Sequence, residues 1–216
     1  MHNYKHRQIK KQEIKEKYSR FARWYDAVEA IPEMLGLKKL RKRLVEKASG
    51  MVLETAVGTG KNLIYYSRDC DITVSDFCFP MLEVAVKKAK KLGLKVRFII
   101  SDTENLAFRS GSFDTVVDSF GLCTFYDPIA ALKEMGRVCN PNGRILLLEH
   151  GRSSREWLGR WQDLRADKHE RQFGCRWNIE LPKLLAQSGL KVLSVQTTFF
   201  GIFYLIEAAP VIENKT

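Results

Sequence analysis

Residues 52–63 read VLETAVGTGKNL: an apolar run, an acidic residue, and then two closely spaced glycines. Glycine is usual where the backbone must adopt a positive φ, or where a ligand must come closer than a Cβ allows. The stretch therefore predicts a phosphate cradle, a turn over the edge of a nucleoside, or a tight strand-to-helix turn with no ligand. The rest of the chain decides among these three.

Short runs rich in β-branched residues alternate with helical stretches from Gly50 onward. Strands are expected at 51–55, 72–76, 96–102, 113–120, 144–150, 190–200 and 202–209. Helices are expected after Gly60, at 80–93, at 128–138, in the basic stretch that begins at residue 151, and at 181–188. This alternation predicts an α/β protein with a mostly parallel, Rossmann-like seven-stranded sheet covered by helices on both faces. The last two strands should pair as an antiparallel hairpin at one edge.

Residues 1–47 differ from the rest of the chain and are called the leader here. They contain 14 lysines and arginines against six acidic residues, which accounts for +8 of the total formal charge of +11. Apolar and aromatic residues recur at helical spacing from Ile9 to about Val28, and a second helix should begin near Pro32. We expect the leader to form a helical lid on a single domain whose body is residues 48–216. Its charge could face nucleic acid, an anionic lipid surface or an acidic partner, or could only solvate a helix.

The five cysteines are odd in number and scattered, with no C-x-x-C pair. Neither a disulfide framework nor a zinc site is therefore expected, and the cytosol or another reducing compartment fits best. The longest uncharged apolar run, 199–206, is too short to span a bilayer, so we expect a soluble or peripheral protein. The basic start leaves a mitochondrial address open, although Glu13, Glu16 and the shortage of serine argue against a presequence.

Acidic residues stand at the ends of the first three expected strands: Glu54, Asp76 and Asp102. Ligands of open α/β sheets bind at these carboxyl ends, and a carboxylate there can accept hydrogen bonds from both hydroxyls of a ribose. The phosphate cradle is disfavoured, because Asn62 replaces the Ser or Thr of a P-loop and Leu63 replaces the third glycine of a dinucleotide fingerprint. Glu54 would repel a pyrophosphate but suits a cation. The favoured cofactor is S-adenosyl-L-methionine, a sulfonium that bears an ammonium group.

Several ordered motifs between about Leu53 and Ala208 resemble class I S-adenosylmethionine-dependent methyltransferases. ETAVGTG stands where that family has E/D-x-G-x-G-x-G, with Ala56 in place of the first glycine. SDFCFPMLEVA, SDTENLAF, SGSFDTVVDSFGL and GRVCNPNGRILLLEH resemble the acidic, adenine, fourth-strand and fifth-strand blocks. KYSRFARWYDAV in the leader resembles the element that folds over the cofactor. The resemblance implies an enzyme that transfers a methyl group.

The resemblance also implies a set of site residues. Those expected to bind the cofactor are Tyr25, Glu54, Thr55, Ala56, Gly58, Gly60, Asn62, Asp76, Phe77, Asp102, Thr103, Glu104, Ser119 and Phe120. His150, at the end of the fifth strand, is the candidate proton acceptor, although a lone histidine is more often a packing or hydrogen-bonded residue. The residues expected to line the acceptor are Tyr18, Trp157, His169 and Asn178. No metal is expected.

The methyl acceptor is left open by the motifs. They are most similar to ubiquinone/menaquinone C-methyltransferases and soluble phosphatidylethanolamine N-methyltransferases, which implies a small amphiphilic acceptor: a phospholipid amine, a quinone precursor or a thiol. A basic amphipathic leader would suit extraction of such an acceptor from an anionic membrane surface. One alternative is an RNA methyltransferase, which the charge favours but the lack of an N/D-P-P-Y motif or an RNA-binding module disfavours. Another is a non-catalytic binding or assembly factor on the same fold.

Overall fold

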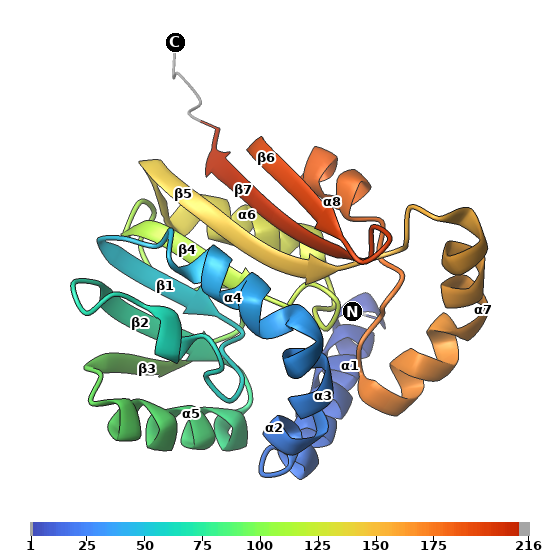
Figure 1. Ribbon diagram of the computed structural model, residues 1–216, viewed down its shortest axis with the longest axis horizontal. Helices are drawn as coiled ribbons and strands as arrows, with labels where there is room; N and C mark the ends of the chain where they lie inside the picture. The colour runs from blue at the N-terminus through green and yellow to red at the C-terminus, as the bar shows by residue number, and fades with distance from the viewer. Residues whose placement is uncertain (1, 212–216) are drawn as a thin grey trace.

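The computed structural model describes residues 2–211, with side chains from Lys10 onward, and is built on one mixed sheet (Figure 1). The strands are β1 (Met51–Thr55), β2 (Asp71–Asp76), β3 (Val96–Ile100), β4 (Phe113–Ser119), β5 (Cys139–His150), β6 (Leu190–Thr198) and β7 (Phe203–Pro210). Their order is β3-β2-β1-β4-β5-β7-β6. The first five strands are parallel, and β7 runs antiparallel to both β5 and β6. The predicted α/β class, seven strands and antiparallel edge hairpin are confirmed.

Helices cover both faces of this sheet. Along β5, Ile145 and Leu147 pack with α6 (Pro128–Val138) and α8 (Leu181–Ser188), whereas Leu146 and Leu148 pack with α4 (Lys38–Val45) and α5 (Phe79–Leu92). All four β5 side chains are fully buried, and each such burial contributes about 1.5–3 kcal/mol. Apolar residues on both sides of one strand are typical of a doubly covered sheet.

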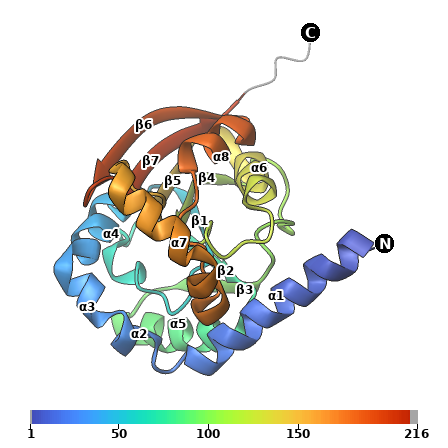
Figure 2. The ribbon, with the colours of Figure 1, turned by 90° about the vertical axis from the view of Figure 1, so that its right-hand side faces the viewer.

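The remaining helices gather beyond the carboxyl ends of the strands (Figures 1 and 2). They are α1 (His2–Phe21), α2 (Tyr25–Val28), α3 (Ala30–Pro32), the wide turn η1 (Glu33–Leu37) and α7 (Glu156–Phe173). The prediction of one helix as far as Val28 is wrong at its end, because the chain turns after Phe21 to bury Ala22 against Cys78 and Met81. None of the helices within residues 2–211 is long and apolar enough to cross a membrane.

The prediction of a helix after Gly60 is also wrong. Only the short 3₁₀ turn η2 (Leu63–Tyr65) forms there, and Tyr66 is already extended, with φ −67° and ψ 140°. Tyr66 turns inward to donate a hydrogen bond to Glu54, so the segment is held by the site instead of continuing as a helix.

Candidate functional site

The glycine-containing turn lies between β1 and η2 and has an unusual backbone. Ala56 has φ 45°, Gly58 φ 54° and Gly60 φ 74°. A Cβ on Gly60 would lie 2.6 Å from the Leu63 side chain, so this glycine is required by packing within the turn. Gly58 has room for a Cβ but is in the left-handed region that favours glycine. Ala56 adopts such a φ without being glycine, which costs about 1–2 kcal/mol.

Asp76, at the end of β2, holds this turn in place. Its carboxylate accepts hydrogen bonds from the Gly58 N–H and the Cys78 N–H, both at 2.8 Å. Burial raises the pKa of Asp76 to about 6, against the opposing effect of these N–H groups. At neutral pH it is a buried carboxylate that lines a cleft and has lone pairs to spare, so it could accept hydrogen bonds from two vicinal hydroxyls.

Glu54, at the end of β1, is only 2% exposed. It accepts hydrogen bonds from Asn62 and from the Tyr66 hydroxyl, each at 2.8 Å. Burial raises the pKa of Glu54 to about 7, although these bonds and the nearby Arg41 lower it. A cationic group entering the cleft would favour the ionised form of Glu54, so this position suits an ammonium.

At the other end of the cleft, α1 reaches Asp102 and Glu104. Lys11 forms an ion pair with Asp102 and a second one with Glu104, the latter at 2.9 Å. The Asp102 carboxylate also accepts the Glu104 N–H at 3.0 Å. The free volume of the cleft is about 80 Å³, whereas small-molecule pockets usually reach about 300 Å³ or more. In this conformation α1 narrows the cleft.

A second, larger cavity of about 550 Å³ adjoins the cleft. It lies between the N-terminal helices and α7, and its walls are mainly apolar and aromatic. Tyr18, Tyr25 and Phe120 line both the cleft and this cavity, which places the two spaces side by side. A molecule in the cavity would therefore face a molecule in the cleft across these rings.

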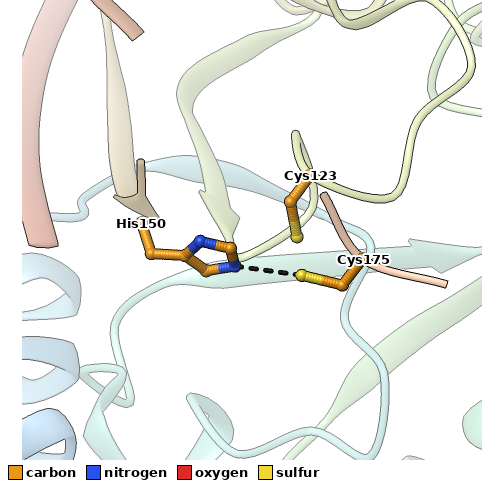
Figure 3. Close-up of side chains that lie close together, drawn as sticks. All are labelled: Cys123, His150 and Cys175. Carbon is orange, nitrogen blue, oxygen red and sulfur yellow. Dashed lines mark hydrogen bonds between the residues drawn. The ribbon is translucent and has the colours of Figure 1, made fainter. Parts of the chain in front are cut away.

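His150, Cys123 and Cys175 meet at the wall of this cavity (Figure 3). The Nε2 atom of His150 lies 3.2 Å from the Cys175 sulfur, and its ring stacks on Phe120 with centroids 5.9 Å apart. The pKa of the Cys175 thiol is held well below its usual value by hydrogen bonding with Cys123 and by the His150 ring, against the effect of burial. His169 stacks on Trp177 behind Cys175, with its Nδ1 atom 2.9 Å from the Cys175 carbonyl.

The structure brings most of the predicted site residues together. Those lining the cleft are Tyr25, Glu54, Ala56, Gly58, Asp76, Phe77, Asp102, Thr103, Glu104, Ser119 and Phe120. Those lining the cavity include Tyr18, Tyr25, Phe120, His150 and His169.

Five predicted residues lie outside both linings. Thr55 is turned into the core, where its hydroxyl donates to Asp118 at 2.6 Å, and Asn62 lies behind Glu54. Gly60 packs on Leu63 within the turn. Trp157 is 68% exposed on the outer surface of α7, and Asn178 donates to Asp163.

Four residues of the two spaces were not predicted from the sequence: Lys11, Arg41, Cys123 and Cys175. Arg41 is buried, donates to Asn62 at 3.2 Å and lies over the Phe120 ring. A signal was present, because Arg41 shares the helical stripe of Leu37 and Leu44. The cysteines and Lys11 had no local signal, since their partners lie far away in the sequence.

The chain is similar in sequence to known methyltransferases. Residues 53–147 match the family described as "Methyltransferase domain". Over 211 residues the chain is 34% identical to the mitochondrial methyltransferase OMS1 of Saccharomyces cerevisiae, covering 88% of this chain and 45% of that protein. It is 38% identical over 145 residues to a ubiquinone/menaquinone biosynthesis C-methyltransferase of Bdellovibrio bacteriovorus, covering 64% and 62%. It is 36% identical over 108 residues to a phosphatidylethanolamine N-methyltransferase of Cereibacter sphaeroides, covering 49% and 53%.

The chain thus spans about half to three fifths of the length of these curated relatives. Among solved structures, one from Thermotoga maritima, described as a SAM-dependent methyltransferase and possible histamine N-methyltransferase, has a TM-score of 0.69 at 22% identity. That match covers 92% of this chain and 100% of the other. At this identity the likeness shows the fold alone.

Proposed function

Residues 53–147 form a domain of the S-adenosylmethionine-dependent methyltransferase family, and from this premise we propose that the chain transfers a methyl group from S-adenosylmethionine to an amphiphilic acceptor. The single observation that carries the proposal is the arrangement of Glu54 and Asp76 in one cleft beside a larger apolar cavity. The cleft has the carboxylates that the cofactor requires, and the cavity has the volume that an acceptor requires.

The cofactor would bind in the cleft through groups that already point into it. Asp76 would accept hydrogen bonds from the ribose hydroxyls, and Glu54 would face the ammonium of the methionine part. Asp102, Thr103 and Glu104 lie where the adenine would be held. When bound, the cofactor supplies an electrophilic methyl group on a sulfonium, and the protein contributes alignment and exclusion of water.

The leader would act as a lid on this cleft. Lys11 forms ion pairs with Asp102 and Glu104. Tyr18 and Tyr25 line both the cleft and the cavity. Because the cleft is too small for the cofactor in this conformation, we propose that α1 moves outward to admit it. The ion pairs of Lys11 would then be exchanged for contacts with the adenine.

The acceptor would be amphiphilic because the larger cavity is built from apolar side chains. Its aromatic and aliphatic walls include Phe21, Val28, Leu37 and Phe203. Burial of such surface stabilises an alkyl chain or an aromatic ring by about 25 cal/mol for each Å² removed from water. A phospholipid amine, a quinone precursor or a thiol with a long apolar tail all satisfy this requirement, and relatives named for quinone and phosphatidylethanolamine substrates support the same class.

An exposed apolar rim beside this cavity supports delivery of the acceptor from a membrane. The rim consists of Trp24, Ile31, Met34 and Leu35, of which Met34 is 84% exposed. It belongs to the same segment as Val28 and Pro32, which line the cavity. Exposed basic residues flank it: Arg20, Arg23, Lys38 and Lys39. Apolar residues ringed by basic ones match a surface of anionic lipid, where each basic residue contributes about 1 kcal/mol.

Methyl transfer is tested with isotope-labelled S-adenosylmethionine and four acceptors: vesicles containing phosphatidylethanolamine, a demethylated quinol, an alkyl thiol and RNA. We expect labelled product with one of the first three and none from the Asp76→Ala variant. Labelling of RNA alone would replace the proposal with the RNA alternative. Tight cofactor binding without transfer to any acceptor would favour the non-catalytic factor.

Membrane delivery is tested separately by sedimentation with vesicles rich in phosphatidylglycerol. The paired substitution Met34→Glu and Leu35→Glu should reduce the bound fraction at low salt. Leu193→Glu, which alters an exposed apolar residue on β6, is the matched control and should leave binding unchanged. Equal vesicle binding by the two variants would refute a role of the rim in membrane binding.

A further inference from the structure

We propose that Cys123, His150 and Cys175 form a binding site for a zinc ion, with an open coordination position that faces the acceptor cavity. The three side chains come from separate parts of the fold: the loop after β4, the last residue of β5 and the segment after α7. Figure 3 shows them pointing toward one another. Their ligand atoms all lie within 4.8 Å of one another.

The separations suit a tetrahedral zinc ion. With Zn–S bonds of about 2.3 Å and Zn–N bonds of about 2.0 Å, tetrahedral ligand atoms are about 3.4–3.8 Å apart. The His150 Nε2 atom is 3.2 Å from the Cys175 sulfur, so that pair is already close to this spacing. To reach this spacing, that pair would lengthen slightly, and a separation of 4.8 Å, the upper limit within the cluster, would shorten by about 1–1.4 Å.

The surroundings of His150 prepare it as a ligand. Its Nδ1 atom lies 3.4 Å from the Trp177 carbonyl, an arrangement that favours a proton on Nδ1 and directs Nε2, the nitrogen that would bind the metal, toward the Cys175 sulfur. Metal-bound histidines usually direct their other nitrogen to a carbonyl or carboxylate in this way. Phe120 stacks on the ring and fixes its orientation. The donor set of two thiols and one imidazole is selective for zinc over hard cations.

The position of the cluster gives the ion a further use. Three protein ligands leave the fourth position of zinc open, as in catalytic sites, and all three residues line the acceptor cavity. A thiol that enters this position would lose its S–H proton to solvent as its sulfur bonds to zinc, since coordination deprotonates a thiol. The site therefore assigns a thiol as the acceptor class and removes the need for a separate base. This last step rests on the proposed function, whereas metal binding does not.

The test uses the full chain purified under reducing conditions, with zinc content measured by elemental analysis and affinity measured by competition with a chromophoric chelator. We expect about one zinc per chain and at least a tenfold weaker affinity in Cys123→Ser and in Cys175→Ser. Cys70→Ser is the matched control, because Cys70 is half-buried like Cys175 but lies before β2, away from the cavity. Its affinity should equal that of the unmodified protein.

Cobalt substitution of the unmodified protein gives a readout that does not depend on the folding of variants. A thiolate-to-cobalt charge-transfer band is expected, and its absence in the reduced, folded protein would overturn the proposal. So would zinc binding that survives both cysteine substitutions, or a Cys123–Cys175 disulfide in a protein that takes up no zinc when reduced. Calorimetry with S-adenosylmethionine distinguishes failure of the metal site from failure of the proposed function. A protein that binds zinc but not the cofactor would support the metal site and refute the proposed function. A protein that binds the cofactor but not zinc would refute the metal site and leave the proposed function supported.

Discussion

Replacing Asp76 with alanine tests the cofactor cleft at the residue that organises it. The substitution removes the carboxylate that we expect to bind the ribose, and it also releases the Gly58 and Cys78 N–H groups. A hydrogen bond to a charged group contributes about 1.5–3 kcal/mol. The dissociation constant for S-adenosylmethionine at pH 7.5 should therefore rise by about 10- to 150-fold.

The pH dependence of this effect follows from the pKa of Asp76, about 6 in the folded protein. Above pH 6 the carboxylate is ionised and binds hydroxyl groups well, and below pH 6 it becomes protonated and this contribution is lost. The difference in affinity between the unmodified protein and Asp76→Ala should thus be large at pH 7.5 and small at pH 5. Calorimetric titration at the two pH values measures it.

Asp71 provides a matched control at the opposite end of β2. It is exposed and pairs with Arg97 at 2.8 Å, so Asp71→Ala should leave cofactor affinity unchanged and alter stability by less than about 1 kcal/mol. Circular dichroism checks that both variants are folded. A folded Asp76→Ala protein with unchanged affinity at pH 7.5 would refute the role given to this carboxylate.

Three further predictions concern the turn, the buried acid and α1. Ala56→Gly should raise the free energy of unfolding by up to about 1 kcal/mol, because the φ of 45° at this position disfavours alanine. As a control, Ala186→Gly in helix α8 should lower the free energy of unfolding by about 1 kcal/mol. Thermal denaturation measures both changes. Burial raises the pKa of Glu54 from 4.5 to about 7, so its stabilising contribution is complete below pH 4.5 and lost as the pH rises through 7. Glu54→Gln should therefore be more stable than the unmodified protein at pH 8, by up to about 3 kcal/mol, and no more stable at pH 4.5; urea titrations at both values measure this. Lys11→Ala should speed tryptic cleavage within α1, and a rate equal to that of the exposed control Lys42→Ala would show that the Lys11 ion pairs do not hold this helix.

The sheet and its helices were predictable because their signals are local. Five short β-branched runs and a final pair of runs mark the seven strands. The helices Pro128–Val138 and Leu181–Ser188 each have a proline in the first turn, where proline is favoured. The end of α1 and the loss of a helix after Gly60 depend on tertiary contacts instead. Ala22 is buried against α5, and Tyr66 is drawn to Glu54.

The residues of the site also divide into those that the sequence pattern reveals and those that only the fold brings together. That Glu54, Asp76 and Asp102 lie in one cleft could be predicted because parallel strands bring their carboxyl ends to one edge of the sheet. Cys123, His150 and Cys175 have no metal-binding spacing, and only the fold brings them within 4.8 Å of one another. Trp157 illustrates the converse, since a helical stripe of aromatic residues does not reveal which of its members face a cavity.

The proposed function depends on binding of S-adenosylmethionine in the cleft through carboxylates that suit a cationic nucleoside. Calorimetric titration of the unmodified chain at pH 7.5 with S-adenosylmethionine, and in parallel with ATP, tests it most directly. We expect one binding site for S-adenosylmethionine with micromolar affinity and no measurable binding of ATP, whose phosphates Glu54 would repel. Folded protein that binds neither ligand, or that binds ATP as tightly as S-adenosylmethionine, would contradict it.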